Sequence, residues 1–240
     1  MRPFPGAPPL ASAGLRARAE RVRIAGPAGE IEALVELPAD IEQHAAAGAA
    51  RTRFGVVCHP HPLYGGTLDN KVVYTLARAF VEMGVPAIRF NFRGVGASEG
   101  NYDDGRGETA DALAVIAYGR ERWPGAALWL AGFSFGGAVA VRAAVQARPE
   151  TLVLAAPGIA RVEMEGIDSP SCPWLIVQGD ADDVIEPAAV LDWAKRQSIA
   201  PAVRLLPGAG HFFHGRLHEL RAEVLQFLEV QKEAPSTASE

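Results

Sequence analysis

From residue 53 onward, short apolar runs alternate with longer amphipathic segments, and this alternation constrains the fold more than any other feature of the sequence. Runs of this length that are apolar throughout are typical of strands in a parallel sheet that is covered on both faces. We therefore predict an α/β fold, with a mostly parallel central sheet and helices on both faces. The predicted strands lie at 54–58, 85–90, 126–131, 151–155, 174–178 and 202–206.

Apolar residues recur at helical spacing between these runs, which predicts the faces that the helices bury. The predicted faces are Val73, Leu76, Ala77 and Phe80; Leu113, Ile116 and Ala117; Val141 and Val145; Val190, Trp193 and Ala194; and Leu217, Leu220, Val224 and Leu228.

The start of the chain has a different pattern. Alternating residues at 21–25 and 30–37 surround a Gly-Pro-Ala-Gly turn, which predicts an antiparallel pair of strands. We predict a single domain over residues 20–231, a flexible N-terminal arm over 1–19 and a flexible C-terminal tail over 232–240.

Composition excludes several classes of protein. The net charge of −5 and the presence of only three lysines offer no basic surface for nucleic acid. No run of about 18 apolar residues exists that could span a membrane, and the N-terminal stretch is too weakly apolar for a signal peptide. We expect a cytoplasmic protein whose two cysteines, Cys58 and Cys172, are reduced and lie at opposite edges of the sheet.

A serine between two glycines follows the third apolar run of this region. The sequence Gly132-Phe133-Ser134-Phe135-Gly136 leads into an alanine-rich segment that we expect to be helical over 135–147. A turn this tight requires a strained backbone at Ser134 and glycines where a Cβ would collide with the other arm. The pattern predicts a nucleophile elbow, which holds a hydroxyl at the carboxyl edge of the sheet and at a helix N-terminus.

Two further motifs accompany this one: Cys58-His59-Pro60-His61-Pro62-Leu63-Tyr64-Gly65-Gly66, and Phe90-Asn91-Phe92-Arg93-Gly94-Val95-Gly96-Ala97-Ser98. With all three, the sequence over about 53–228 resembles the α/β-hydrolase superfamily, in its compact bacterial carboxylesterase and dienelactone-hydrolase-like branch. The resemblance implies an α/β-hydrolase fold and a serine esterase. The segment 157–173 is too short to build a large cap domain.

An activated serine needs a base and an acid, which follow it in this superfamily in the order Ser, Asp, His. The resemblance assigns the base to His211, after the last predicted strand, and the acid to Asp182, three residues after Gly179. Asp180 and Asp183 are close rivals, which we interpret as turn or helix-end carboxylates.

Other histidines have more ordinary interpretations. His214 and His218 stand four apart on one predicted helix face, but no third ligand accompanies them. We interpret them as solvated helix residues, and His59 and His61 as parts of a loop scaffold. We predict no metal and no cofactor.

The oxyanion hole needs backbone N–H groups, one of which we assign to Phe135, the residue after the serine. Proline has no N–H, so the second donor within Pro60-His61-Pro62-Leu63 is His61 or Leu63, and the resemblance favours His61. Aromatic and apolar residues beside the motifs are candidates for substrate binding, although a core role is as common for each. These candidates are Leu63, Tyr64, Phe133 and Phe212.

The favoured function is therefore hydrolysis of small-molecule carboxylic esters through an acyl-enzyme. A thioesterase, a lactonase or a peptidase would use the same residues, and a non-catalytic binding protein on the same fold is a further alternative. A dinucleotide-binding oxidoreductase is disfavoured because the glycine pattern at 94–96 lacks its third glycine. The oligomeric state stays open.

Overall fold

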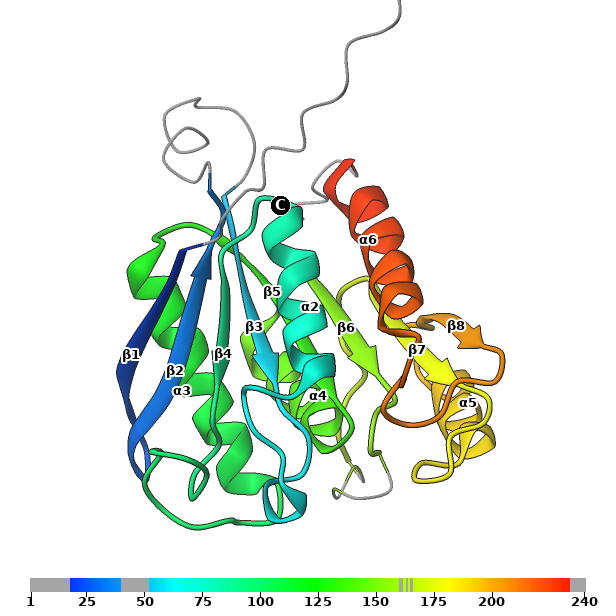
Figure 1. Ribbon diagram of the computed structural model, residues 1–240, viewed down its shortest axis with the longest axis horizontal. Coiled ribbons are helices and arrows are strands. Elements are labelled where there is room, and N and C mark those ends of the chain that lie inside the picture. The colour runs from blue at the N-terminus through cyan, green and yellow to red at the C-terminus, as the bar shows by residue number, and fades with distance from the viewer. Residues whose placement is uncertain (1–17, 40–51, 160–161, 163, 165, 234–240) are drawn as a thin grey trace, which may run out of the picture.

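An eight-stranded sheet with the strand order β1-β2-β4-β3-β5-β6-β7-β8 forms the centre of the molecule (Figure 1). This computed structural model describes residues 18–39, 52–159, 162, 164 and 166–233. The strands are β1 (Arg18–Gly26), β2 (Gly29–Leu37), β3 (Arg53–Cys58), β4 (Ala87–Phe90), β5 (Ala127–Phe133), β6 (Thr151–Ala155), β7 (Trp174–Gly179) and β8 (Ala202–Leu206). β2 pairs antiparallel with β1 and with β4, and all the other neighbouring strands are parallel.

Helices cover both faces of the sheet (Figure 1). On one face α2 (Lys71–Glu82) packs beside α6 (Leu217–Glu233), and on the other α3 (Arg106–Arg122) packs beside α4 (Phe135–Ala147), with α5 (Pro187–Lys195) near β7. Each face buries its own apolar core, so the strands from β3 to β7 are buried on both sides. The edge strands β1 and β8 are partly exposed, because each has a neighbouring strand on one side only. The predicted architecture of a mostly parallel sheet between two helical layers is confirmed.

The predicted helix faces are confirmed for α2 and α5, whereas α3 differs. Ala117 is exposed, and the buried face of α3 is formed by Ala112, Val115, Ile116 and Gly119. The reason is the close approach at Gly119, where an added Cβ would lie 2.3 Å from the ring of Phe54. A prediction from the spacing of apolar side chains does not count glycine as part of a buried face. The face predicted for α3 is therefore rotated about the helix axis relative to the face that is buried.

Two short stretches that were predicted to belong to the arm and the tail form regular structure. Residues 18 and 19 are part of β1, and residues 232 and 233 are part of α6. The rest of the predicted arm and tail lie outside the described residues. Among the residues that are described, no helix combines the length and the apolar character needed to cross a membrane.

Both cysteines are buried and free, as predicted. Burial raises the pKa of both thiols, that of Cys172 to about 12, so neither is a ready nucleophile.

The carboxyl ends of β3, β5, β7 and β8 face the same edge of the sheet because these strands are parallel. The loops that follow them therefore gather at one edge, where ligand sites in such sheets form. Within the described part of the loop between β6 and β7 there is no helix or strand.

Candidate active site

Ser134 is the single residue between β5 and α4. Its backbone has φ 55° and ψ −122°, a conformation that costs a non-glycine residue about 1–3 kcal/mol. Four backbone hydrogen bonds hold it there: the Ser134 N–H donates to the Ala155 carbonyl at 3.0 Å, and its own carbonyl accepts from Gly137 and Gly158, both at 2.8 Å, and from Ala138 at 3.3 Å. The strained turn predicted from the sequence is therefore present and fixed from both sides.

The glycines around Ser134 are required for steric reasons. A Cβ on Gly132 would lie 2.2 Å from the Gly136 carbonyl oxygen, in the opposite arm of the turn, as predicted. A Cβ on Gly136 would instead lie 2.3 Å from the carbonyl oxygen of His59, beyond the end of β3. The expectation that Gly136 faces the other arm of the turn was wrong, since this glycine lets α4 approach the loop that follows β3.

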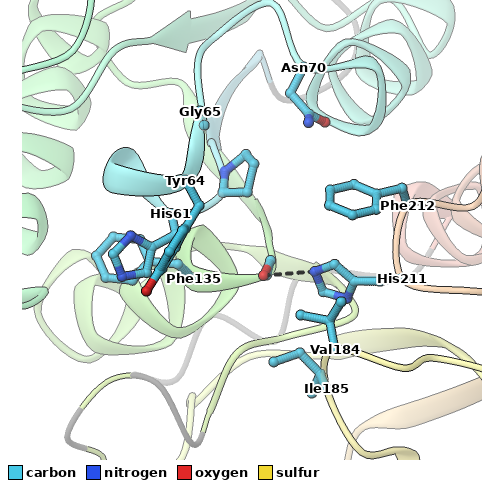
Figure 2. Close-up of a pocket in the computed structure, with 12 residues that line it drawn as sticks. His61, Tyr64, Gly65, Asn70, Phe135, Val184, Ile185, His211 and Phe212 are labelled. Carbon is cyan, nitrogen blue, oxygen red and sulfur yellow. Dashed lines mark hydrogen bonds between the residues drawn. The ribbon is translucent and has the colours of Figure 1, made fainter.

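His211 and Asp182 complete a chain of hydrogen bonds with Ser134. The Nε2 atom of His211 lies 3.0 Å from Ser134 Oγ (Figure 2), and its Nδ1 atom lies 2.9 Å from Asp182 Oδ2. All three residues are buried, with 3–8% of their surface exposed. A carboxylate facing Nδ1 keeps the proton on that nitrogen, so Nε2 is left to accept the proton of the serine hydroxyl.

The Asp182 carboxylate is itself held by four donors. Oδ1 accepts from the backbone N–H groups of Val184 and Ile185 at 2.9 and 2.8 Å, and Oδ2 accepts from Gln178 Nε2 at 2.9 Å as well as from His211. Burial alone would raise the pKa of Asp182, but the hydrogen bonds from His211, Ile185 and Val184 outweigh it and hold the pKa below its ordinary value. The carboxylate is therefore ionised at neutral pH.

Neither rival aspartate shares this position. Asp180 is exposed and accepts a hydrogen bond from the backbone N–H of Gly208 at 2.5 Å, and Asp183 is also exposed. Of the three candidates, the structure brings Asp182 alone to His211.

Gln178 was missed by the sequence analysis. It is the one polar residue in the apolar run that forms β7, and it is fully buried next to Gly179. A buried amide four residues before the acid is a signal that could have identified it as a partner of that acid.

The loop after β3 is anchored by His59. This buried imidazole donates from Nδ1 to the Pro60 carbonyl at 2.6 Å and accepts at Nε2 from the Phe92 backbone N–H at 3.0 Å. Burial lowers the pKa of His59 to about 3, although the hydrogen bond to Pro60 favours the protonated form. His59 is a scaffold residue, as predicted, and its low pKa makes it neutral at neutral pH.

The ring of His61 contacts the ring of Phe135, the residue that follows Ser134. The two ring centroids are 4.8 Å apart. Its Nδ1 atom accepts the backbone N–H of Leu63 at 3.3 Å and thereby caps the short 3₁₀ helix η1 (Pro62–Tyr64). Its Nε2 atom is 3.2 Å from the hydroxyl of Tyr102, another residue that the sequence analysis missed. The N–H of Leu63 therefore already has an acceptor within the loop, which disfavours Leu63 as the oxyanion donor.

A cavity of ≈ 430 Å³ opens in front of Ser134 (Figure 2). Tyr64 and Phe212 line it, as does Phe135, whereas two other predicted pocket residues do not. Leu63 is 66% exposed on η1, and Phe133 is fully buried beneath the His211 ring at 5.0 Å. Their predicted place in the pocket wall was wrong because η1 turns one outward and β5 turns the other into the core.

Three further residues that belong to none of the motifs described above also line the cavity: Asn70, Val184 and Ile185. Asn70 precedes α2, and the other two follow the acid in the loop after β7. No spacing rule in the sequence distinguishes them from ordinary loop residues.

His214 and His218 are both exposed, as expected of solvated residues, but the prediction that they share a helix face was wrong. His214 lies in the turn before α6, which begins at Leu217. Over the described ranges, no group of three or more His, Cys, Asp or Glu side chains is placed to hold a metal ion.

Known proteins resemble this chain over most of its length. An α/β serine hydrolase without a lid from Xanthomonas campestris is 37% identical, with a TM-score of 0.82, over 91% of this chain and 97% of that one. An α/β serine hydrolase homologue from Coxiella burnetii is 40% identical, with a TM-score of 0.80, over 87% and 97% of the two chains.

Two further comparisons rest on sequence. An uncharacterised protein from Rickettsia prowazekii is 33% identical over 214 residues, which is 85% of this chain and 86% of that protein. The model of a family described as serine aminopeptidase, S33, matches residues 65–170, a segment that includes Ser134 and ends before Asp182 and His211.

Proposed function

This chain belongs to the α/β serine hydrolases, and we propose that it hydrolyses carboxylic esters by way of an acyl-enzyme formed on Ser134. The observation that carries the proposal is the continuous hydrogen-bond chain from Ser134 Oγ through His211 to Asp182. The fold lacks a large cap, and Ser134 and His211 line the cavity, so a substrate in the cavity can reach both.

In the first half of the reaction, Ser134 Oγ attacks the carbonyl carbon of the ester and His211 Nε2 takes the hydroxyl proton. Asp182 stabilises the imidazolium that forms. The tetrahedral intermediate then collapses as the bond to the alcohol oxygen breaks, and His211 returns the proton to that oxygen. In the second half, water attacks the acyl-enzyme with His211 as base, which releases the carboxylic acid and restores Ser134.

The negative charge on the carbonyl oxygen needs donors that are in place before the reaction. Phe135 is the first residue of α4, so its N–H has no acceptor within the helix. We assign the two donors to the backbone N–H groups of Phe135 and His61, whose side chains are in contact beside the cavity. Tyr64 and Phe212 are assigned to the walls that contact the substrate.

The composition of the cavity favours an ester over an aminopeptidase substrate. An aminopeptidase has to bind the protonated amino group at the start of a peptide, for which a carboxylate is the natural partner. No Asp or Glu among the described residues lines this cavity, whose walls include Tyr64, Phe135, Val184, Ile185 and Phe212. These walls suit the apolar part of an ester.

The test is hydrolysis of p-nitrophenyl esters from acetate to laurate by the wild type and by Ser134→Ala. We expect turnover by the wild type and a loss of about 10⁴–10⁶-fold in the variant. An aminoacyl p-nitroanilide series in parallel tests the peptidase alternative. Turnover of the anilides alone would overturn the ester assignment, and turnover of neither, with no labelling of Ser134 by a fluorophosphonate, would indicate a non-catalytic binding protein.

A further inference from the structure

A second, smaller cavity of ≈ 160 Å³ adjoins the one in front of Ser134. The two cavities share Asn70 and Phe212, so they meet at these two side chains. Lys71 and His214 lie in the wall of the smaller cavity. An ester bound at Ser134 that extends past Phe212 would therefore meet Asn70 first and Lys71 next.

The orientation of the Asn70 amide is fixed by the helix that follows it. Its Oδ1 atom accepts the backbone N–H groups of Val72 at 2.9 Å and Val73 at 3.4 Å, and so caps α2. With the oxygen committed to the helix, the Nδ2 atom remains as a donor, and no described residue accepts a hydrogen bond from it. Figure 2 shows this side chain extending from the start of α2 toward the cavity, across from Phe212.

Lys71 adds a positive charge next to this donor. Its side chain is exposed, and none of the ion pairs between described residues involves it. The neighbouring Asp69 lies 3.6 Å from Arg89, and Arg216, close to His214 in sequence, is paired with Glu219 at 2.6 Å. In the part of the chain that the structure describes, no Asp or Glu lines either cavity, although the whole chain carries a net charge of −5.

We propose that Asn70 Nδ2 and Lys71 Nζ form a subsite for a carboxylate, so that the enzyme prefers esters that carry a free carboxylate in addition to the scissile bond. This inference rests on the proposed ester hydrolysis. An amide N–H and an ammonium group are both donors with no competing acceptor, and together they match a carboxylate. Because one of the pair is exposed, we expect a preference of about 5- to 20-fold in kcat/KM.

The test compares esters that differ only in charge. Mono-ethyl glutarate and its amide analogue, ethyl glutaramate, place the group on the acyl side, and the butyrate ester of glycolate and that of glycolamide place it on the alcohol side. Acid release is followed at constant pH near 7.5. The wild type is expected to prefer the carboxylate member of at least one pair, and that preference is expected to fall in 0.5 M NaCl.

Three variants assign the preference to residues. Lys71→Gln and Asn70→Asp should each reduce the ratio of carboxylate to amide turnover to about 1, and Asp preserves the helix cap. Lys195→Gln is the matched control, because it removes the same charge from α5, where Lys195 is paired with Asp192. A ratio near 1 in the wild type, or one equally reduced in Lys195→Gln, would overturn the subsite while the ester hydrolysis stands.

Binding provides a readout that does not depend on turnover. Glutarate should raise the melting temperature of Ser134→Ala, and this shift should disappear when Lys71→Gln is added. If no ester is cleaved and the Lys71-dependent shift remains, the proposed function fails and the subsite stands. If the shift is the same with and without Lys71, the subsite is overturned.

Discussion

The Nε2 atom of His211 lies 3.0 Å from the Oγ atom of Ser134, although 77 positions separate the two residues in the sequence. One stands at the turn into α4 and the other in the loop after β8, and the parallel strands bring both loops to the same sheet edge. Either residue alone is chemically ordinary. Their contact produces a serine whose proton has an acceptor.

Replacement of Asp182 with Asn is expected to abolish most of the activity while the fold is retained. The amide oxygen can take the place of Oδ1 and still accept from Val184 and Ile185. The amide NH₂ group then takes the place of Oδ2 and cannot accept from His211 Nδ1, so the His211 tautomer that receives the serine proton is no longer favoured. In a comparable triad this substitution lowers kcat by about 10⁴. We expect a similar loss in p-nitrophenyl ester turnover.

Asp180→Asn and Asp183→Asn are the matched controls for this prediction, because both carboxylates are exposed in the same loop. Each should keep kcat within about threefold of the wild type, as surface substitutions usually do. A larger loss of kcat in Asp180→Asn than in Asp182→Asn would identify Asp180, and not Asp182, as the acid that acts with His211.

Replacement of His61 with Pro tests the second oxyanion donor. The φ of His61 is −53°, which the proline ring can adopt, so the substitution removes the N–H with little change of the backbone. Loss of one donor costs about 2.7–4 kcal/mol of transition-state stabilisation, which corresponds to a fall of about 10²–10³-fold in kcat.

His61→Ala separates this effect from the loss of the side chain. It also removes the ring that contacts Phe135 and Tyr102, but it keeps the N–H. We expect it to be the more active of the two variants by at least about tenfold. Equal activities would mean that the side chain, and not the N–H, is what the reaction needs.

Replacement of Gly136 with Ala should destabilise the protein, even though alanine is the better helix former. The new Cβ would lie 2.3 Å from the His59 carbonyl oxygen and 2.5 Å from that of Cys58, and both are backbone atoms that cannot rotate away. Overpacking of this kind costs about 1–3 kcal/mol, which urea unfolding would detect.

Gly137→Ala is its neighbour and control. There the nearest atoms belong to Pro157, at 3.1 Å, and the gain in helix propensity of about 0.5–1 kcal/mol offsets the tighter contact. We expect a change in the free energy of unfolding near zero. An equal loss in both variants would show that α4 does not depend on its close approach to the loop after β3.

The sequence was sufficient for the elements whose signal is local. The helix predicted over 135–147 and the strands predicted at 151–155 and 202–206 have those bounds in the structure. The glycines around Ser134 indicated the tight turn because its geometry allows little else. These features follow from backbone sterics and from burial, both of which leave a mark on neighbouring residues.

What the sequence could not predict depends on directions set by packing. Three aspartates share one short loop, and only the donors from Gln178, Val184 and Ile185 determine which of them faces His211. Likewise Phe212 and Phe133 are the same type of residue, yet Phe212 lines the cavity and Phe133 is buried in the core. The difference between them is the face of β5 on which Phe133 lies, which composition does not encode.

The buried His59 makes the stability of the protein depend on pH in a defined window. Its folded pKa of about 3 is below the value near 6.5 that the unfolded chain has. Above about pH 6.5 the imidazole is neutral in both states and costs nothing. As the pH falls from there toward 3, the unfolded chain binds a proton that the folded chain does not, so the free energy of unfolding falls by up to about 1.4 kcal/mol per pH unit.

Urea unfolding of the wild type and of His59→Asn at pH 7, 6 and 5 would measure this contribution. Asparagine has the same kind of donor and acceptor and does not titrate, so the variant should lose less stability on acidification. At pH 7 it should be less stable than the wild type, because it lacks the buried ring. Asp182 and Glu32, whose pKa values are held low in the fold, lose their contributions only at lower pH, and equally in both proteins. Two parallel curves would mean that the folded protein accepts the proton at His59, and the hydrogen bond from Phe92 to Nε2 would then be absent in solution.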